Sequence, residues 1–319
     1  RKSWEHVKQQ GDNKELFMQR GALGETPLHQ AVLFANNDPN EDYAIVKDLC
    51  SQHEPLRTAQ YEENLYKGEN VLHIALVRKL PIDLIKFLIQ DGPTARKLLQ
   101  QQATGDFFLN DACDTKKELN FGERPLAFAA CTNQRDVFDL LLERAGQLSP
   151  PLTKDLLARR TSIGGYSLLH LLVLHSTENR TPRQGDSSEQ NVSEFDRVPE
   201  EEAGGGELPW YCEMYDHIEN TMRKHKDKDF GDLFERMRKT PDEEGHIPLS
   251  LAAARGSLKM FNHLMEKRMQ TEWRYGPVLC QRLYLEGVDI PLDNQELQGR
   301  VGGSNDRLFV SVLEVVVNH

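Results

Sequence analysis

One pattern recurs five times along the chain and limits what it can fold into. Each copy has a glycine, a leucine four residues later, and a small or apolar residue three residues further on. The five sets are Gly24/Leu28/Ala31, Gly68/Leu72/Ala75, Gly122/Leu126/Ala129, Gly165/Leu169/Leu172 and Gly245/Leu249/Ala252. Such a repeat predicts helical units that bury their apolar faces only against neighbouring units. An array of this kind presents a surface to partners more readily than it encloses a pocket.

The first complete copy shows the physical logic of the repeat. Gly24 suits a turn that needs a positive φ angle. Thr26 can cap a helix, and Pro27 fits its first turn, where no backbone hydrogen bond is lost. Leu28 and Ala31 then fall on one helical face. We therefore expect a short helix here, with a second helix completing each unit.

Capping residues differ between the copies. Asn70 and Ser167 can replace Thr26 as side-chain caps, whereas Arg124 and Ile247 cannot. We expect the helices after Arg124 and Ile247 to start less firmly.

Three histidines, His29, His73 and His170, occupy equivalent repeat positions. A catalytic histidine would not recur with the repeat, so we expect a structural role. Cys131 is interpreted as a buried small hydrophobe, with a reactive thiol as the alternative. The sequence contains no HExxH motif and no phosphate-binding Gly-Lys-Ser/Thr loop. These observations predict that the chain is not an enzyme and holds no metal or cofactor.

Charge and cysteine content narrow the class of protein. The net charge of −11 argues against nucleic acid as a partner, because phosphate binding needs a basic face. Five cysteines, an odd number without CxxC spacing, are typical of free thiols in a reducing cytosol. No apolar run approaches the roughly 20 residues that cross a bilayer. The chain starts without an initiator methionine or a signal-like stretch, so we expect a piece of a longer protein.

Two long insertions interrupt the array. The loop expected at about 97–120 carries Phe107 and Phe108, which either fold back on the array or dock on a partner. The segment from Ser176 to Pro209 holds nine acidic residues and three arginines. We interpret it as a flexible solvated excursion, with partner binding as the alternative.

After Arg268 the helical pattern gives way to alternation. Segments 272–278 and 281–285 predict a β-hairpin, whose free edge invites another strand. We divide the chain into a repeat domain at 1–268 and the start of a second module at 269–319. The stretch from Leu308 to Val317 could open another helix or strand.

One mildly basic segment runs from Met222 to Lys239. Its amphipathic pattern makes it a candidate calmodulin ligand. A solvated helix and loop is the alternative, favoured by Gly231 and by the acidic residues in the segment.

The repeat resembles the ankyrin repeat. The TPLHxA signature of that family is present from Thr26 to Ala31, although the glycines are spaced more widely than its roughly 33 residues. Arg1 to Gln19 looks like the tail of an earlier unit. We therefore expect an all-α ankyrin-repeat solenoid of about six repeats, the first truncated or degenerate, followed by a small linker region with a β-hairpin.

Four segments are similar to the cytoplasmic N-terminal domain of vanilloid-type transient receptor potential channels. They are Tyr66 to Ala75, Ala103 to Phe108, Phe121 to Gln134, and Thr271 to Val278. Their order and approximate spacing also agree, and the resemblance covers nearly the whole chain.

This resemblance implies a cytosolic assembly and regulatory domain of a tetrameric, calcium-permeable cation channel. The domain would lie at the cytosolic face of the plasma membrane, with membrane helices elsewhere in the full protein. Its partners would be neighbouring subunits and regulatory proteins. The resemblance assigns Phe107, Phe108, Trp273 and Tyr275 to the contact between subunits. A soluble ankyrin-repeat adaptor is the alternative, and an enzyme carrying ankyrin repeats has less support.

Some members of that family bind ATP on their ankyrin repeats through lysines and a glutamine. The matching positions here are Glu25, Gln30 and Glu69. Carboxylates facing a triphosphate would repel it, so we expect no ATP binding at this face.

Overall fold

The computed structural model describes most of the chain. The described residues are 18–35, 42–108, 122–178, 208–286, 288, 312 and 315. The chain divides into a first unit, residues 1–156, and a second unit, residues 157–319. Each unit is described by itself.

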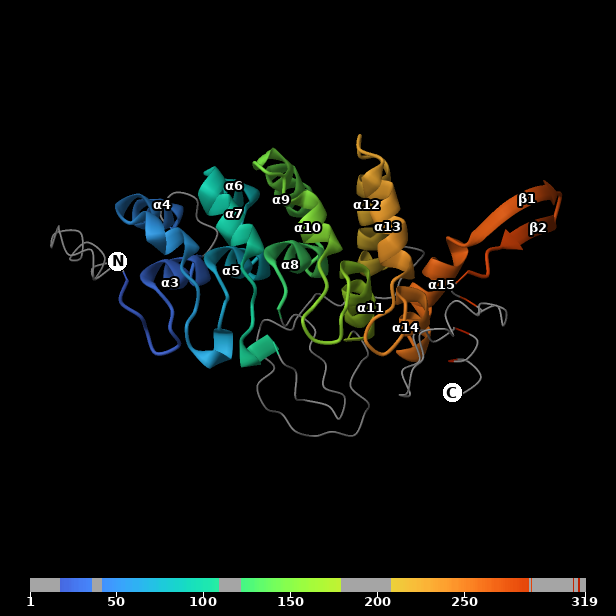
Figure 1. Ribbon diagram of the computed structural model, residues 1–319, viewed down its shortest axis with the longest axis horizontal. Helices are drawn as coiled ribbons and strands as arrows, with labels where there is room; N and C mark the ends of the chain where they lie inside the picture. The colour runs from blue at the N-terminus through green and yellow to red at the C-terminus, as the bar shows by residue number, and fades with distance from the viewer. Residues whose placement is uncertain are drawn as a thin grey trace. The chain divides into compact units, whose positions relative to one another are not determined.

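The first unit is built from short helices connected by long turns (Figure 1). A row of short helices forms one layer, in which α5 packs against both α3 and α8. A second layer covers the row, with α4 against α3 and with α9 against α6, α7 and α8. The helices are α3 (Pro27–Leu33), α4 (Asp42–Gln52), α5 (Val71–Val77), α6 (Ile82–Leu88), α7 (Gly92–Gln100), α8 (Pro125–Cys131), α9 (Arg135–Gln147) and α10 (Thr153–Ala158), the last of which crosses the unit boundary.

Short 3₁₀ turns complete the first unit. They are η1 (Glu54–Thr58), η2 (Asn64–Tyr66) and η3 (Asp106–Phe108).

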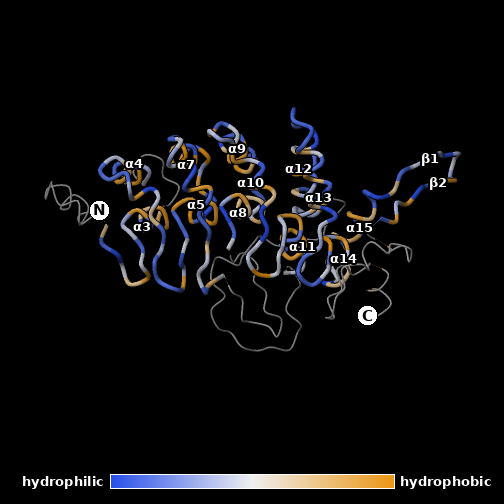
Figure 2. Tube along the Cα trace, in the orientation of Figure 1, coloured by the Kyte–Doolittle hydropathy of each residue, from blue (hydrophilic) through white to orange (hydrophobic). Residues whose placement is uncertain are grey.

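Most leucine and alanine positions of the repeat lie in the core of the first unit, whereas Ala31 is only partly buried. Leu28, Leu72 and Ala75 have no exposed surface, nor does Ala129. Hydrophobic residues gather in the helices, whereas the turns between them are largely hydrophilic (Figure 2). Small residues let neighbouring helices approach closely, which is why alanine follows leucine in this layer.

The repeat glycines adopt the left-handed conformation that the pattern predicts. The φ angles of Gly24, Gly68, Gly122, Gly165 and Gly245 lie between +62° and +87°. At Gly68 an added Cβ would come within 2.1 Å of a backbone carbonyl oxygen on the next loop. Glycine is therefore required there both by backbone conformation and by space.

The caps follow the sequence expectation. Thr26 and Asn70 accept hydrogen bonds from backbone N–H groups in the first turns of α3 and α5. Arg124 makes no side-chain cap for α8. The N–H of Ile247 is instead accepted by the hydroxyl of Ser250, at 3.0 Å.

The second unit contains five described helices and one hairpin. Helix α11 packs against α12 and α14, while α12 also contacts α13 and α15. Helix α12 supplies the second helix that was expected to complete the unit begun by α11. The elements are α11 (Leu168–Glu178), α12 (Trp210–Arg223), α13 (Asp229–Lys239), α14 (Pro248–Ala254), α15 (Leu258–Glu266), β1 (Met269–Tyr275) and β2 (Val278–Leu283).

The predicted hairpin is present, but its turn lies earlier than expected. Strands β1 and β2 pair in antiparallel orientation, and the chain reverses at Gly276 and Pro277. Val278, assigned above to the first strand, opens the second. Gly276 has a φ of +55°, a conformation that tight turns need and that glycine adopts without strain.

The loop expected from residue 97 begins later than predicted. Helix α7 continues to Gln100, because Leu98 and Leu99 are fully buried and anchor its last turn. Within the described ranges the chain is mostly helical with a two-stranded antiparallel sheet, which fits a helical repeat domain.

Several predicted segments lie wholly or largely outside the described residues. They are most of Arg1 to Gln19, residues 109–120 of the expected loop, residues 179–207 of the acidic insertion, and Leu308 to Val317 apart from Val312 and Val315.

Candidate subunit interface

Most of the large apolar side chains that the described part of the second unit exposes lie on the hairpin. Every residue of β1 is exposed, and only Cys280 of β2 is partly covered. Trp273 is 55% exposed and Tyr275 82% exposed. Large side chains left in water on a protruding element mark a surface that binds a partner.

A register shift between Thr271 and Trp273 sorts these side chains onto the two faces. Trp273 pairs with Cys280, and Tyr275 pairs with Val278. Because paired residues share a face of the sheet, these four lie together on one face. On the other face lie Met269, Thr271, Arg274, Leu279, Gln281 and Leu283. Without the shift, Met269 and Thr271 would join the aromatic face.

Both faces of the hairpin therefore carry apolar side chains. A two-stranded sheet that stays in water normally keeps polar residues on at least one face. Two strands alone are also only marginally stable. The arrangement fits an element that is covered when the full protein assembles.

In the first unit, Phe107 lies on η3 and is 49% exposed. Its ring centroid is 5.0 Å from that of Tyr66. Tyr66 in turn lies 5.7 Å from Tyr61, which lies 4.5 Å from His29. Aromatic rings thus run across successive turns and end at Phe107, since distances of this order are typical of favourable ring pairs.

Backbone contacts fix the position of the segment that carries Phe107. The N–H of Thr104 donates to the carbonyl of Lys67 at 2.7 Å. At Gly105 a Cβ would lie 2.3 Å from the carbonyl oxygen of Leu65, so the two turns touch through backbone atoms. Phe107 is therefore presented on a supported turn.

The structure brings two of the four predicted interface residues together. Trp273 and Tyr275 share one face of the hairpin, whereas Phe107 belongs to the first unit. The side chain of Phe108 lies outside the described residues.

Sequence reasoning missed other exposed apolar residues near these positions. They are Leu65, Leu279, Leu283, Tyr284 and Leu285. Leu279 and Leu283 are four positions apart in β2 and therefore fall on the same face of a strand, which was a usable signal for both.

The three recurrent histidines support the turns, as their recurrence predicts. In each case Nδ1 accepts a hydrogen bond from the backbone N–H of the cap residue: Thr26, Asn70 or Ser167. The Nε2 group of His170 also donates to the carbonyl of His246, at 2.9 Å. Burial lowers the pKa of all three imidazoles to about 3. They are neutral at physiological pH and act as fixed hydrogen-bonding groups.

Two carboxylates at the predicted nucleotide-facing positions differ in their electrostatics. Backbone hydrogen bonds lower the pKa of Glu25, which also accepts from Gln30 at 3.0 Å. Burial raises the pKa of Glu69 to about 8, although part of its surface reaches solvent. Glu25 is therefore ionised at neutral pH, while Glu69 is largely protonated. The repulsion expected from both carboxylates rests on Glu25.

The candidate calmodulin segment uses its apolar face inside the second unit. Phe230, Leu233, Phe234 and Met237 of α13 are buried, and α13 packs against α12. The alternative of a solvated helix holds only for the exposed side of α13 and for the turn before it.

Other chemistry is sparse in the described part of the chain. Cys131 is buried, as its interpretation as a small hydrophobe predicts. The described residues contain no group of three or more histidine, cysteine or carboxylate side chains able to hold a metal ion. Within the same ranges, no helix has the length and apolar character needed to cross a membrane.

Comparisons with known proteins identify relatives of the chain. It is 29% identical over 281 residues to human transient receptor potential cation channel subfamily V member 6, a match that covers 88% of this chain and 29% of the relative. The rat subfamily V member 5 is 29% identical over 280 residues, covering 86% of this chain and 29% of the relative. The human subfamily V member 2 is 28% identical over 294 residues, covering 87% and 32%. No model of a known protein family matches the chain.

These relatives are named as ion channels and not as enzymes. The chain spans about 29% of the length of the first two, so it corresponds to one part of such a protein. Its similarity nevertheless extends over nearly all of its own length. The resemblance inferred from the four sequence segments is thereby confirmed: the homologues of this chain are subunits of vanilloid-type transient receptor potential cation channels.

Proposed function

We propose that the chain is the cytosolic assembly domain of a calcium-permeable cation channel subunit. In the full protein it would lie at the cytosolic face of the plasma membrane. Residues 1–268 would form about six ankyrin repeats, and residues 269–319 would begin a linker toward the membrane helices. The homologous channel subunits and the layered helical repeat support this proposal.

The hairpin, with apolar side chains on both faces, gives this proposal its strongest structural support. The exposed side chains of β1 add nothing to the core of the second unit, because β1 contributes no buried residue. A neighbouring copy of the chain supplies a complementary surface. The supported turn that carries Phe107 offers an aromatic side chain of matching character.

In the proposed tetramer, Phe107 and Phe108 of one subunit pack against Trp273 and Tyr275 of the next. Aromatic residues at the centre of an interface commonly carry most of its binding energy. Each subunit would use both surfaces, so the contact is head-to-tail and closes into a ring.

Cysteine cross-linking in the full-length protein tests this arrangement. Phe107→Cys and Tyr275→Cys should together give covalent dimers and higher species when treated with a short bifunctional thiol reagent. The control pairs Tyr275→Cys with Leu258→Cys, since Leu258 is 68% exposed but lies on α15. Equal cross-linking in both pairs, or none in either, would contradict the proposed contact.

A soluble adaptor remains the second candidate function, since helical repeat arrays commonly bind protein partners. The adaptor account predicts that the full-length protein is recovered in the soluble fraction without detergent. The channel account predicts that it is recovered with membranes.

We further propose that the chain binds no ATP at the face of Glu25 and Gln30. The ionised carboxylate of Glu25 would repel a triphosphate. Isothermal titration calorimetry should detect no heat of ATP binding, and saturable binding abolished by Glu25→Ala would refute this.

Calmodulin binding by the segment from Met222 to Lys239 is a separate prediction. Binding would require the apolar face of α13 to leave α12, since that face is buried. Affinity for calmodulin measured on the folded chain should therefore be far weaker than on the isolated peptide.

A further inference from the structure

The hairpin is attached to the second unit almost entirely through its base. All of β1 and nearly all of β2 are exposed, so among the described residues no apolar core fixes the direction in which the strands point. What holds the hairpin must therefore lie where β1 begins and where β2 ends.

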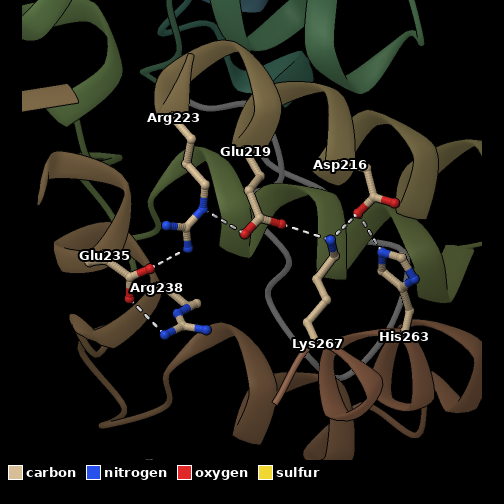
Figure 3. A network of polar contacts seen from close by, with 7 residues as sticks. All are labelled: Asp216, Glu219, Arg223, Glu235, Arg238, His263 and Lys267. Atoms are coloured by element: carbon tan, nitrogen blue, oxygen red, sulfur yellow. Dashed lines mark hydrogen bonds and ion pairs between the residues drawn. The ribbon is translucent and has the colours of Figure 1, made fainter. Parts of the chain in front are cut away.

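A chain of ion pairs ends at the residue two positions before β1. The Nζ atom of Lys267 lies 2.7 Å from Asp216 Oδ1 and 2.7 Å from Glu219 Oε2. Figure 3 shows this ammonium group placed between the two carboxylates. Because Asp216 and Glu219 are three residues apart on α12, they face the same side of that helix. Lys267 therefore forms two ion pairs with the same face of α12.

Each carboxylate has a further partner besides Lys267. His263 Nε2, on α15, lies 2.7 Å from Asp216 Oδ1. Arg223 Nε donates to Glu219 Oε1 at 2.9 Å and its guanidinium also pairs with Glu235 on α13 (Figure 3). The carboxylates are thus oriented before Lys267 reaches them.

The network is balanced in charge and partly shielded from water. Its third carboxylate, Glu235, also accepts from Arg238 at 2.6 Å. Three carboxylates face the cations Arg223, Arg238 and Lys267, with His263 as an additional donor. The side chain of Lys267 is 26% exposed and that of Glu219 16% exposed. Partial burial weakens screening by salt, so these pairs hold geometry better than pairs in open solvent.

A second contact secures the other end of the hairpin. Lys239 Nζ, at the end of α13, lies 2.8 Å from Glu286 Oε1, which follows β2. The N–H of Tyr284 donates to the carbonyl of the buried Arg268, at 3.0 Å, and closes the base. The entry and the exit of the hairpin are therefore tied to α12 and α13.

We propose that Lys267 is the positioning residue of the hairpin, and that its two contacts with α12 set the direction in which the strands project. Burial disfavours the ammonium charge, but the hydrogen bonds to Asp216 and Glu219 outweigh that effect and raise the pKa of Lys267. The lysine is charged across the physiological range. The inference concerns the second unit alone and holds whether or not the hairpin binds another subunit.

Pulsed electron paramagnetic resonance on the whole 319-residue chain tests the proposal. Spin labels at Asn220→Cys, exposed on α12, and Val278→Cys, at the hairpin tip, report the distance between the two elements. The background carries Cys113→Ser and Cys280→Ser so that these thiols do not react. The unchanged network should give a narrow distance distribution.

Lys267→Met removes the charge while keeping a long side chain, and should at least double the width of that distribution. Lys267→Arg should restore a narrow distribution, because it returns a cation to the same place. The control Lys86→Met removes a lysine from an exposed pair with Asp83 in the first unit and should change nothing. Circular dichroism should show that helix content is kept in all three variants.

The proposal is overturned if Lys267→Met keeps its helices and gives the same width as the parent chain. It is also overturned if Lys86→Met broadens the distribution equally. Should Lys267→Met fail to fold, the parent chain in 1 M salt decides. Screening over about 3 Å at that ionic strength weakens partly exposed pairs, so the distribution should broaden, and an unchanged width would refute the role of the ion pairs.

Discussion

Replacing His170 by glutamine should make the second unit less sensitive to acid. His170 is fully buried, and its Nδ1 accepts from the N–H of Ser167 at 3.2 Å. Glutamine at this position can also reach back to the N–H of a capping serine, so the start of α11 should be kept. The hydrogen bond to the carbonyl of His246 would be lost, which lowers stability equally at every pH. The change therefore isolates the ionisable group.

The size of the effect follows from proton linkage. Burial holds the pKa of His170 at about 3 in the folded chain, against about 6.5 when the chain is unfolded. Between these values the unfolded state binds a proton that the folded state does not. The free energy of unfolding therefore has its full value above about pH 6.5 and decreases as the pH falls toward 3. From pH 7 to pH 5 the loss is about 2 kcal/mol, and it hardly changes for any folded pKa below about 4.

Urea unfolding at pH 7 and at pH 5 measures this difference, with circular dichroism and tryptophan fluorescence as readouts. The parent chain should lose about 2 kcal/mol more than His170→Gln over this interval. The control is His225→Gln, which removes an exposed histidine of the same unit. Equal pH dependence in the parent chain and His170→Gln would refute the reasoning.

Further predictions concern several residues of the first unit and one glycine of α13, and urea unfolding measures the change in the free energy of unfolding for each variant. Asn70→Ala should cost about 2 to 3 kcal/mol, because the side chain caps α5 and its amide also donates to the carbonyl of Leu98 and to Gln101 Oε1. Thr26→Ala should cost about 1 kcal/mol, and equal costs would contradict this reasoning. Gly68→Ala should cost about 3 kcal/mol or more, owing to the φ of +84° and to the carbonyl oxygen that the added Cβ would meet. Gly231→Ala in α13 should instead stabilise the chain by about 1 kcal/mol, because no atom lies within 4 Å of the added Cβ. Burial raises the pKa of Glu69 in the folded chain to about 8, so the free energy of unfolding falls as the pH rises toward that value. The parent chain should lose about 2 kcal/mol of stability between pH 6 and pH 8, and Glu69→Gln should not show this loss. The same pH profile in both chains would contradict the burial argument.

Local sequence signals predicted much of the fold because local physics decides those features. The left-handed turns at Gly24 and Gly68 needed glycine, and the caps at Thr26 and Asn70 needed short polar side chains. The recurrence of His73 at the repeat position indicated a structural role. The period-two alternation after Arg268 predicted the hairpin.

Features that depend on distant contacts were not readable from the chain. The extension of α7 to Gln100 depends on what covers Leu98 and Leu99. The shift at Thr271 depends on pairing with β2, and it decides which face carries Trp273.

The charged network of the second unit was hidden for the same reason. In sequence, Asp216, Arg223 and Lys267 look like ordinary solvated charges. Only the packing of α12 against α13 and α15 brings Lys267 to Asp216 and Arg223 to Glu235. The raised pKa of Glu69 likewise reflects its burial, which the sequence does not display.

In the proposed function, this chain helps to assemble a cation channel through its hairpin. The most direct test is to record whole-cell currents from cells that express the full-length protein containing this chain, beside a Trp273→Ala/Tyr275→Ala variant. The account predicts a cation current with a calcium component, and a strongly reduced current in the variant at equal expression. Absence of any current from the parent protein, or an undiminished current in the variant, would contradict it.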